Sequence, residues 1–381
     1  MTSPRAAAPR EKARREEAER LDVEILSAIG GGWEEPLSEN EFDRLVRDVF
    51  AHQFRFLPAY RQLCELRGVS APADVTSWRG IPPVPAGAFK VGRWTTFPPE
   101  AEVVAFRTSG TMQGSSGVHR LDTLGLANAA ILKSARRYVL PDRERIRCLF
   151  LSPRPSVAAH SSLVHMFAVY LEAFGEPGSG FLFDRPGRGV GPGAVPPALD
   201  AAAPSGEPVL VAGPALAWLG VLELSGASWA LPEGSRSLVT GGFKGTRRRT
   251  SPDELAQVIE ERLGIPRSRQ VEEYGMTELS SQFYDAGLRR EQGFGDETGA
   301  GFRVPPWMRV RIIDPDTGHD VEDGEPGAIV HYDLANRGSA MVVQTSDVGV
   351  AVDGGFRLIG REPGAEARGC SLAAELWFER V

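Results

Sequence analysis

The feature that most limits how this chain can fold is a regular alternation of buried strands and helices between residues 146 and 263. Continuous apolar runs at 146–151, 209–214 and 237–240 predict buried strands. A helical pattern follows each of these runs. The last helical pattern begins with Ser251 at the N-cap, Pro252 at the first helical position and Glu254 at the third. Strands that alternate with helices in this way predict an α/β fold with a largely parallel sheet.

Beyond Val304 the sequence changes to short β-type runs separated by turns such as Asp-Pro-Asp-Thr-Gly. The runs cover residues 308–313, 327–332, 340–344 and 356–359. They predict a smaller antiparallel β subdomain after the α/β part. The predicted segments are an N-terminal arm (1–37), an α/β core that binds nucleotide and acyl group (38–303), a β subdomain (304–360) and a short C-terminal segment (361–381).

The N-terminal third supplies two weaker expectations. Residues 38–67 carry apolar side chains at three- and four-residue spacings, which predicts helical structure, and Ser38 with Glu41 forms a capping box at its start. Residues 1–20 are rich in Ala, Arg and Glu, and fit either a frayed helix or a disordered arm. Residues 175–208 are rich in Gly and Pro and resemble a surface excursion.

Charge and cysteine content exclude several classes of protein. The chain of 381 residues has a net charge of −7, which argues against a general nucleic-acid binder. Its three cysteines, Cys64, Cys148 and Cys370, are far apart and odd in number, so they predict neither a disulfide framework nor a zinc site. Cys64 and Cys148 lie in apolar patterns and are predicted core residues. The sequence has no signal-peptide core and no run of about 18 apolar residues, so we expect a cytoplasmic protein without a membrane span.

Residues 106–119 form a glycine- and hydroxyl-rich stretch, Phe-Arg-Thr-Ser-Gly-Thr-Met-Gln-Gly-Ser-Ser-Gly-Val-His. It follows an alternating apolar run and precedes a helical pattern that begins near Asp122, so we expect a strand, a loop and then a helix. In that setting, backbone N–H groups and hydroxyls can cradle a phosphate. A flexible surface loop fits the composition equally well. The stretch is not a Walker loop, because no Gly-Lys-Ser/Thr follows at the required spacing.

Three later motifs also carry groups that a nucleotide needs. Residues 274–278 read Tyr-Gly-Met-Thr-Glu and place an aromatic ring, a hydroxyl and a carboxylate within one short segment. These groups suit base stacking, phosphate binding and Mg²⁺ coordination. Asp347 ends the motif Thr-Ser-Asp after a predicted strand, where a carboxylate can bind ribose hydroxyls. Gly360-Arg361 follows the last strand.

The order and spacing of these motifs resemble the adenylate-forming superfamily of acyl-CoA synthetases, nonribosomal adenylation domains and luciferases. The segments that carry the resemblance are Thr108-Ser109-Gly110-Thr111, Thr240-Gly241-Gly242, Tyr274-Gly275-Met276-Thr277-Glu278, Thr345-Ser346-Asp347 and Gly360-Arg361. In that superfamily they correspond to the phosphate loop, the adenine-pocket segment, the Tyr-Gly-x-Thr-Glu signature, the Thr-Gly-Asp motif and the hinge arginine. The resemblance therefore implies an adenylate-forming large domain.

Within that superfamily the chain is most similar to LuxE-type acyl-protein synthetases, the fatty-acid-activating component of bacterial bioluminescence reductases. The similar segments are Ile81-Pro82-Pro83-Val84-Pro85, Phe89-Lys90, Ser161-Ser162-Leu163-Val164-His165-Met166 and Gly180-Phe181. The resemblance extends from about Glu39 to the C-terminus.

The resemblance implies a role for each motif residue. ATP phosphates would be held by the loop residues Thr108, Ser109, Gly110 and Thr111. Thr277 would bind the AMP phosphate and Glu278 would hold Mg²⁺. The adenine would be framed by Gly241, Gly242, Tyr274 and Gly275, and the ribose by Asp347 and Arg361. Catalysis would consist mainly of donors and a cation placed where negative charge develops.

Two departures from the superfamily pattern bear on mechanism. The superfamily adds a mobile C-terminal domain of about a hundred residues with a lysine, whereas only a short segment follows Gly360 here, as in LuxE-type proteins. Met112-Gln113 also replaces the usual Thr-Gly of the phosphate loop, and the lysine common in that loop is missing.

Cys370 has two possible roles. LuxE-type proteins carry a cysteine near the C-terminus that accepts the acyl group, and Cys370 lies at the matching place. Nearby Arg361 and Arg368 could favour its thiolate. The alternative is a small apolar residue packed under the terminal strand.

The sequence therefore predicts ATP- and Mg²⁺-dependent, AMP-forming activation of a carboxylic acid, expected to be a fatty acid. The acyl group would move from the acyl-adenylate to Cys370 and then to a partner such as an acyl reductase. Two alternatives remain open. One is an adenylating ligase that uses CoA, a carrier protein or an amine without Cys370, and the other is a non-catalytic nucleotide-binding scaffold. The candidate residues that line the acyl pocket are apolar and therefore suggest an apolar acyl part. They are Phe181, Phe243, Met276 and Phe283.

Overall fold

A computed structural model describes residues 4–108, 116–185, 189–190, 192–241, 251–295 and 299–361. Its helices are α1 (Pro4–Gly31), α2 (Glu39–Phe56), α3 (Pro58–Leu66), α4 (Gly125–Tyr138), α5 (Ser162–Phe174), α6 (Val195–Ala202), α7 (Ala215–Ser225), α8 (Pro252–Leu263) and α9 (Gly287–Glu291). Within the described ranges, none of these helices combines the length and the hydropathy needed to cross a membrane.

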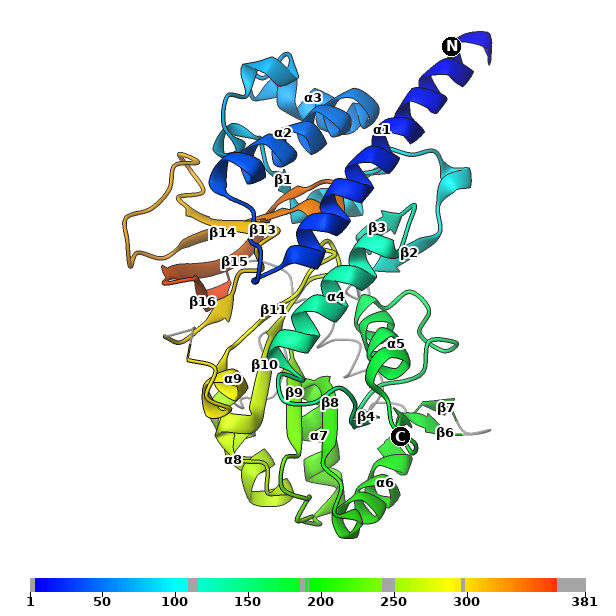
Figure 1. The fold of residues 1–381 in the computed structure, drawn as a ribbon, viewed down its shortest axis with the longest axis vertical. Helices are drawn as coiled ribbons and strands as arrows, with labels where there is room; N and C mark the ends of the chain where they lie inside the picture. The colour runs from blue at the N-terminus through cyan, green and yellow to red at the C-terminus, as the bar shows by residue number, and fades with distance from the viewer. Residues whose placement is uncertain are drawn as a thin grey trace.

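One twelve-stranded sheet forms the frame of the molecule (Figure 1). Its spatial order is β13 (Met308–Ile313), β14 (Gly327–Asp333), β15 (Val342–Val352), β16 (Gly355–Arg361), β12 (Phe302–Arg303), β11 (Phe283–Tyr284), β10 (Gln270–Tyr274), β9 (Arg236–Thr240), β8 (Val209–Pro214), β4 (Arg147–Phe150) and β5 (Gly180–Phe181). A further short strand, β1 (Val84–Pro85), pairs in parallel with β15.

The half of the sheet from β5 to β10 is parallel, as the alternation of strands and helices predicted. Successive residues of β8 face opposite sides of the sheet, because side chains alternate along a strand. Leu210 and Ala212 pack in one core with α4 and α5, whereas Val209 and Val211 pack in another with α6, α7 and α8. Helices therefore cover both faces of this half, and the predicted α/β fold is confirmed (Figure 1).

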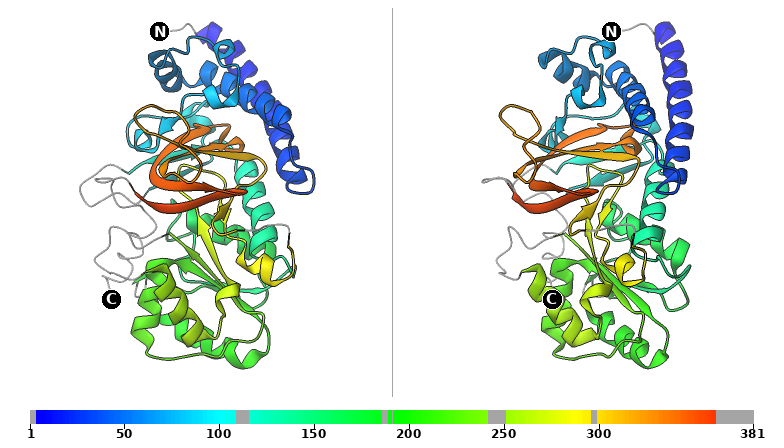
Figure 2. Two further views of the ribbon diagram at one scale, coloured as in Figure 1. Left: turned by 90° about the vertical axis from the view of Figure 1, so that its left-hand side faces the viewer. Right: turned by 60° about the vertical axis from the view of Figure 1, so that its left-hand side comes forward.

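The other half of the sheet is antiparallel. Strands β13 to β16 pair with one another in antiparallel fashion, and β12 and β11 connect them to β10. This half lies between the N-terminal helices and the parallel half (Figure 2). The sheet is continuous across the two halves, so the division into residues 38–303 and 304–360 remains a prediction that rests on the change of strand direction.

The N-terminal segment differs in detail from the expectation. The helical pattern over residues 38–67 is two helices, because Pro58 has no N–H to continue the first and occupies the first turn of the second. The predicted capping box of Ser38 and Glu41 is confirmed. Of the two alternatives for residues 1–20, the structure shows a helix, α1, which buries Leu21 in the core.

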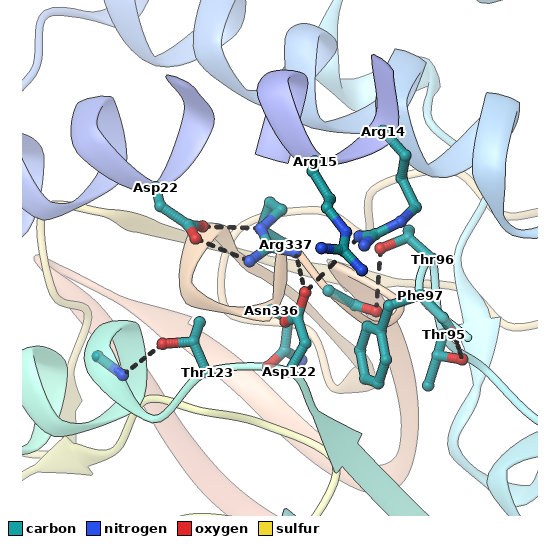
Figure 3. A network of polar contacts seen from close by, with 12 residues as sticks. Arg14, Arg15, Asp22, Thr95, Thr96, Phe97, Asp122, Thr123, Asn336 and Arg337 are labelled. Carbon is teal, nitrogen blue, oxygen red and sulfur yellow. Dashed lines mark hydrogen bonds and ion pairs between the residues drawn. The ribbon is translucent and has the colours of Figure 1, made fainter. Parts of the chain in front are cut away.

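An ion-pair network attaches α1 to the rest of the molecule (Figure 3). Arg337 is only 1% exposed, and its Nε and Nη2 lie 2.7 and 2.8 Å from the two carboxylate oxygens of Asp22 on α1. Its Nη1 lies 2.9 Å from Asp122. A buried guanidinium needs paired carboxylates, so these contacts fix α1 against the antiparallel half of the sheet.

The Gly- and Pro-rich region at 175–208 is more structured than a surface excursion. Its described residues include β5, the short hairpin of β6 (Asp184–Arg185) and β7 (Gly189–Val190), and α6. Val195 and Leu199 of α6 are buried. Proline is tolerated in the first turn of a helix, so the two prolines at the start of α6 do not prevent it from forming.

Candidate active site

The glycine-rich stretch joins two antiparallel strands, β2 (Val104–Arg107) and β3 (Val118–Leu121). The predicted order of strand, loop and helix is therefore wrong, because β3 intervenes before α4 begins. A phosphate held by this stretch would rely on backbone N–H groups and hydroxyls rather than on a helix that starts directly from the loop. The alternation in Val118–Leu121 was a signal for a strand that the sequence analysis missed. Half-buried and buried residues alternate along this strand.

Thr108 closes the base of this hairpin loop. Its backbone N–H donates to the carbonyl oxygen of Gly117 at 2.9 Å, and the N–H of Gly117 donates to the Thr108 hydroxyl oxygen at 2.7 Å. In the second contact the Thr108 hydroxyl acts as an acceptor, which leaves its hydrogen free to be donated elsewhere as far as the described residues are concerned. The other predicted phosphate-binding residues lie outside the described residues and are Ser109, Gly110 and Thr111.

His119 of β3 connects the hairpin to the Tyr-Gly-Met-Thr-Glu segment. Its Nδ1 lies 2.8 Å from the carbonyl oxygen of Thr277, although the two residues are 158 positions apart. The strand that follows the predicted phosphate loop and the predicted signature therefore meet in space. His119 was not predicted as a site residue, because nothing in the sequence indicates a contact over this separation.

Tyr274, at the end of β10, contacts the predicted ribose-binding residues. Its hydroxyl donates to one carboxylate oxygen of Asp347 at 2.8 Å, and Nε of Arg361 donates to the other at 2.8 Å. Asp347 and Arg361 are also direct partners in the register of β15 and β16. Asp347 therefore joins the end of β10 to β16 through its two carboxylate oxygens.

Aromatic rings hold Tyr274 in place. Phe283, Phe302 and Phe356 lie with their ring centroids 5.4 to 5.8 Å from that of Tyr274. Phe283 is fully buried in this cluster, so it supports the Tyr274 ring in this structure instead of lining an open acyl pocket.

The backbone around Glu278 is fixed by buried side chains. Nδ2 of Asn336 donates to the carbonyl oxygen of Glu278 at 2.8 Å, and the Ser280 hydroxyl donates to Oδ1 of Asn336 at 2.7 Å. The N–H groups of Ser280 and Ser281 both donate to Oδ2 of Asp333, at 3.0 and 2.9 Å. Burial raises the pKa of Asp333 above its usual value. The sequence carried one signal for these residues, because Asp333 comes directly after the predicted strand at 327–332 and Asn336 lies three residues later.

Glu273 is a further buried acid that the sequence analysis did not select. It is the register partner of Thr240, whose hydroxyl donates to its carboxylate, and burial raises the pKa of Glu273 to about 7. A Cβ at Gly275 would lie 2.4 Å from a carboxylate oxygen of Glu273, so a larger residue there would require the Glu273 side chain to move. Thr240 leads directly to Gly241, which has a φ of 69°, whereas Gly242 lies outside the described residues.

Glu278 suits a Mg²⁺ ion that arrives with a nucleotide. Its side chain is buried, and no three His, Cys, Asp or Glu residues within the described ranges form a cluster able to hold a metal. Mg²⁺ in nucleotide sites is bound by one or two carboxylates together with phosphate oxygens and waters. A single carboxylate at this position fits that kind of coordination.

The described cysteines have no role in this site. Cys64 and Cys148 are fully buried, as predicted, and burial raises the pKa of each thiol to about 12. Cys370 lies outside the described residues. A cavity of 520 Å³ is lined by Arg67, Arg79 and Gln344 among others, and no predicted site residue lines it.

Comparison with solved structures identifies the class of fold. An open conformation of 2-hydroxyisobutyryl-CoA ligase in complex with 2-HIB-AMP and CoA matches 86% of this chain and 71% of its own, with a TM-score of 0.59 and 13% identity. O-succinylbenzoate coenzyme A synthetase from Bacillus subtilis, in complex with AMP, matches 68% of this chain and 49% of its own, with a TM-score of 0.45 and 20% identity. The fold is that of the adenylate-forming enzymes.

The family follows from the sequence itself. The model of the family described as acyl-protein synthetase, LuxE, matches residues 14–378, and the chain belongs to that family. A long-chain-fatty-acid–luciferin-component ligase of Aliivibrio fischeri is 24% identical over 116 residues, which is 30% of this chain. That match spans only 28% of the length of the ligase.

Proposed function

We propose that this protein activates a carboxylic acid with ATP. A carboxylate oxygen attacks the α-phosphorus, the bond from that phosphorus to the β-phosphate oxygen breaks, and acyl-AMP and pyrophosphate are the products. The proposal is supported by membership of the LuxE family and by the adenylate-forming fold.

The observation that carries the proposal is a series of contacts between described motifs that are far apart in the sequence. His119 lies two residues after Gly117, which pairs with Thr108 at the base of the loop. The Nδ1 atom of His119 contacts the carbonyl oxygen of Thr277. Tyr274, three residues before Thr277, reaches Asp347, which holds Arg361. Contacts therefore connect β3 with residues 274–277, and residues 274–277 with Asp347 and Arg361, which supports a nucleotide site assembled from several motifs.

Each residue has a proposed part in the reaction. Thr108, with Ser109, Gly110 and Thr111, binds phosphates, and Thr277 binds the α-phosphate as negative charge develops on it. Bound Mg²⁺, held by Glu278, supplies charge neutralisation at the phosphates. Asp347 and Arg361 orient the ribose, while Gly241, Gly242, Tyr274 and Gly275 frame the adenine.

The acyl group then moves to Cys370. Its thiolate attacks the carbonyl carbon of the acyl-adenylate, a thioester forms and AMP leaves. The family description, acyl-protein synthetase, and the name of the Aliivibrio fischeri relative support a protein-bound acyl group and a long-chain fatty acid. An acyl reductase is the proposed next partner. A ligase that delivers the acyl group to CoA, a carrier protein or an amine is the alternative.

Pyrophosphate exchange tests the proposal. The purified protein is incubated with ATP, Mg²⁺, labelled pyrophosphate and a panel of carboxylic acids that spans short, long-chain and aromatic members. We expect label to enter ATP only when an acid is added, most strongly with long-chain fatty acids. Nucleotide binding without acid-dependent exchange for any member would instead identify a non-catalytic nucleotide-binding scaffold.

A further inference from the structure

His119 is a buried imidazole whose two nitrogens have different surroundings. The side chain is 1% exposed, and its ring meets that of Phe89 edge-on at a centroid distance of 6.0 Å. A carbonyl oxygen only accepts hydrogen bonds, so Nδ1, 2.8 Å from the Thr277 carbonyl, carries the proton. Burial lowers the pKa of His119 to about 4, so the ring is neutral near pH 7.

The other nitrogen lacks a hydrogen-bond partner among the described residues. Nε2 of His119 is buried without a hydrogen-bond donor from the part of the chain that the structure describes. Because Nδ1 holds the proton, Nε2 is a bare acceptor, and an unsatisfied buried acceptor destabilises a fold. Packing alone would be served better by an apolar side chain, so the value of an imidazole here lies in its Nδ1 contact.

That contact fixes one peptide plane beside Glu278. The peptide unit is planar, so a bond to the Thr277 carbonyl sets the orientation of the whole unit between Thr277 and Glu278. Asn336 holds the next unit through the carbonyl oxygen of Glu278. The Cα of Glu278 therefore lies between two anchored peptide planes, one held from β3 and the other from the turn after β14.

We infer that His119 is a positioning residue, which sets the direction of the Thr277 and Glu278 side chains toward the phosphates and Mg²⁺ of bound nucleotide. The inference rests on the proposed function for the identity of the ligand. It also links the phosphate loop to these side chains, because His119 lies two residues after Gly117 at the loop base.

Three substitutions test the role of Nδ1. His119→Asn keeps an amide N–H near the position of Nδ1, whereas His119→Leu removes the donor and His119→Gln places its amide farther out. We expect His119→Leu and His119→Gln to raise the KM for Mg²⁺–ATP about ten-fold to a hundred-fold, and His119→Asn to stay within about three-fold of wild type. Titration calorimetry of Mg²⁺–ATP, without the acid, gives the same comparison independently of turnover.

His52→Leu is the matched control. His52 is also a fully buried histidine, on α2, and both of its ring nitrogens lack a hydrogen-bond partner in the described structure. Its loss should leave the KM and the nucleotide affinity unchanged, and thermal unfolding of every variant reports stability separately.

The outcomes separate the two proposals. A wild-type protein without acid-dependent exchange defeats the proposed function, while the calorimetric comparison of variants still tests His119. Normal exchange by wild type together with unchanged nucleotide affinity in His119→Leu overturns the inference. Equal loss in His119→Asn and His119→Leu also overturns it, since the donor would then not matter. If His119→Leu does not fold, the nucleotide affinities of His119→Asn and His119→Gln are compared instead. Equal affinities of these two variants would overturn the inference.

Discussion

The hydroxyl of Tyr274 lies 2.8 Å from a carboxylate oxygen of Asp347, a residue 73 positions later in the chain. This bond joins the end of the parallel half of the sheet to the antiparallel half. Arg361 completes the arrangement from the neighbouring strand, so the two predicted ribose-binding residues and the predicted adenine-framing tyrosine form one connected group.

Tyr274→Phe removes one donor from a buried carboxylate. We expect a loss of about 1–3 kcal/mol in the free energy of unfolding and weaker nucleotide binding, because the buried Asp347 carboxylate would lose the hydrogen bond from the Tyr274 hydroxyl. Urea unfolding and titration with AMP measure the two effects. Tyr170→Phe is the control, since its hydroxyl contacts Tyr284 at 2.6 Å inside the core, so it should alter stability without altering nucleotide affinity.

Asp347→Asn is expected to affect nucleotide binding more than Tyr274→Phe does. The amide keeps one acceptor oxygen, but it loses the charge that pairs with Arg361 and the second acceptor oxygen of the carboxylate. We predict an increase of at least about ten-fold in the KM for ATP, equivalent to about 1.4 kcal/mol. An unchanged KM would contradict the proposed ribose contact.

Glu273 predicts a pH dependence of stability. Its pKa is raised from 4.5 to about 7, so the folded protein binds more protons than the unfolded chain between these values. The stability that this group contributes is therefore complete below about pH 4.5 and is lost as pH rises through about 7.

Glu273→Gln should remove that dependence. Its midpoint of urea unfolding should fall less than that of wild type between pH 5 and pH 8, because the amide does not ionise and can still accept from Thr240. Parallel curves for the two proteins over this range would show that Glu273 titrates normally.

Arg337→Leu should detach α1. The substitution leaves Asp22 and Asp122 without their shared cation, and breaking a buried ion pair in this way costs about 3–5 kcal/mol. We expect a lower unfolding midpoint and faster proteolysis within residues 4–31. Arg44→Leu, which removes an exposed arginine paired with Glu24 of α1, should change the midpoint little.

Cys370→Ser separates acyl-adenylate formation from acyl transfer. We expect acid-dependent pyrophosphate exchange to stay within about three-fold of wild type, and the stable acyl-protein formed with labelled fatty acid to disappear. Cys148→Ala serves as control, because its buried thiol is not expected to accept the acyl group. Persistence of the labelled acyl-protein in Cys370→Ser would favour another acceptor.

Structural features that depend on residues close together in the sequence were predicted well. The cap of α8 by Ser251, the burial of β8 and the helices that follow the strands at 146–151 and 209–214 depend on residues a few positions apart, and the structure confirms them. The prediction was wrong or left open where the local sequence pattern was ambiguous. Val118–Leu121 is too short to separate a strand from the lead-in to a helix, and α1 depends on buried contacts with distant residues.

The sequence by itself determined the family and the alternation of strands and helices, and it predicted which motifs carry nucleotide chemistry. Only the tertiary structure decided how these motifs meet: that His119 holds the Thr277 carbonyl, that Asn336 holds the Glu278 carbonyl, and that Tyr274 and Arg361 share Asp347. The physical reason is that local preferences depend on neighbouring residues, whereas a hydrogen bond between distant residues forms only when the packed sheet brings donor and acceptor within about 3 Å.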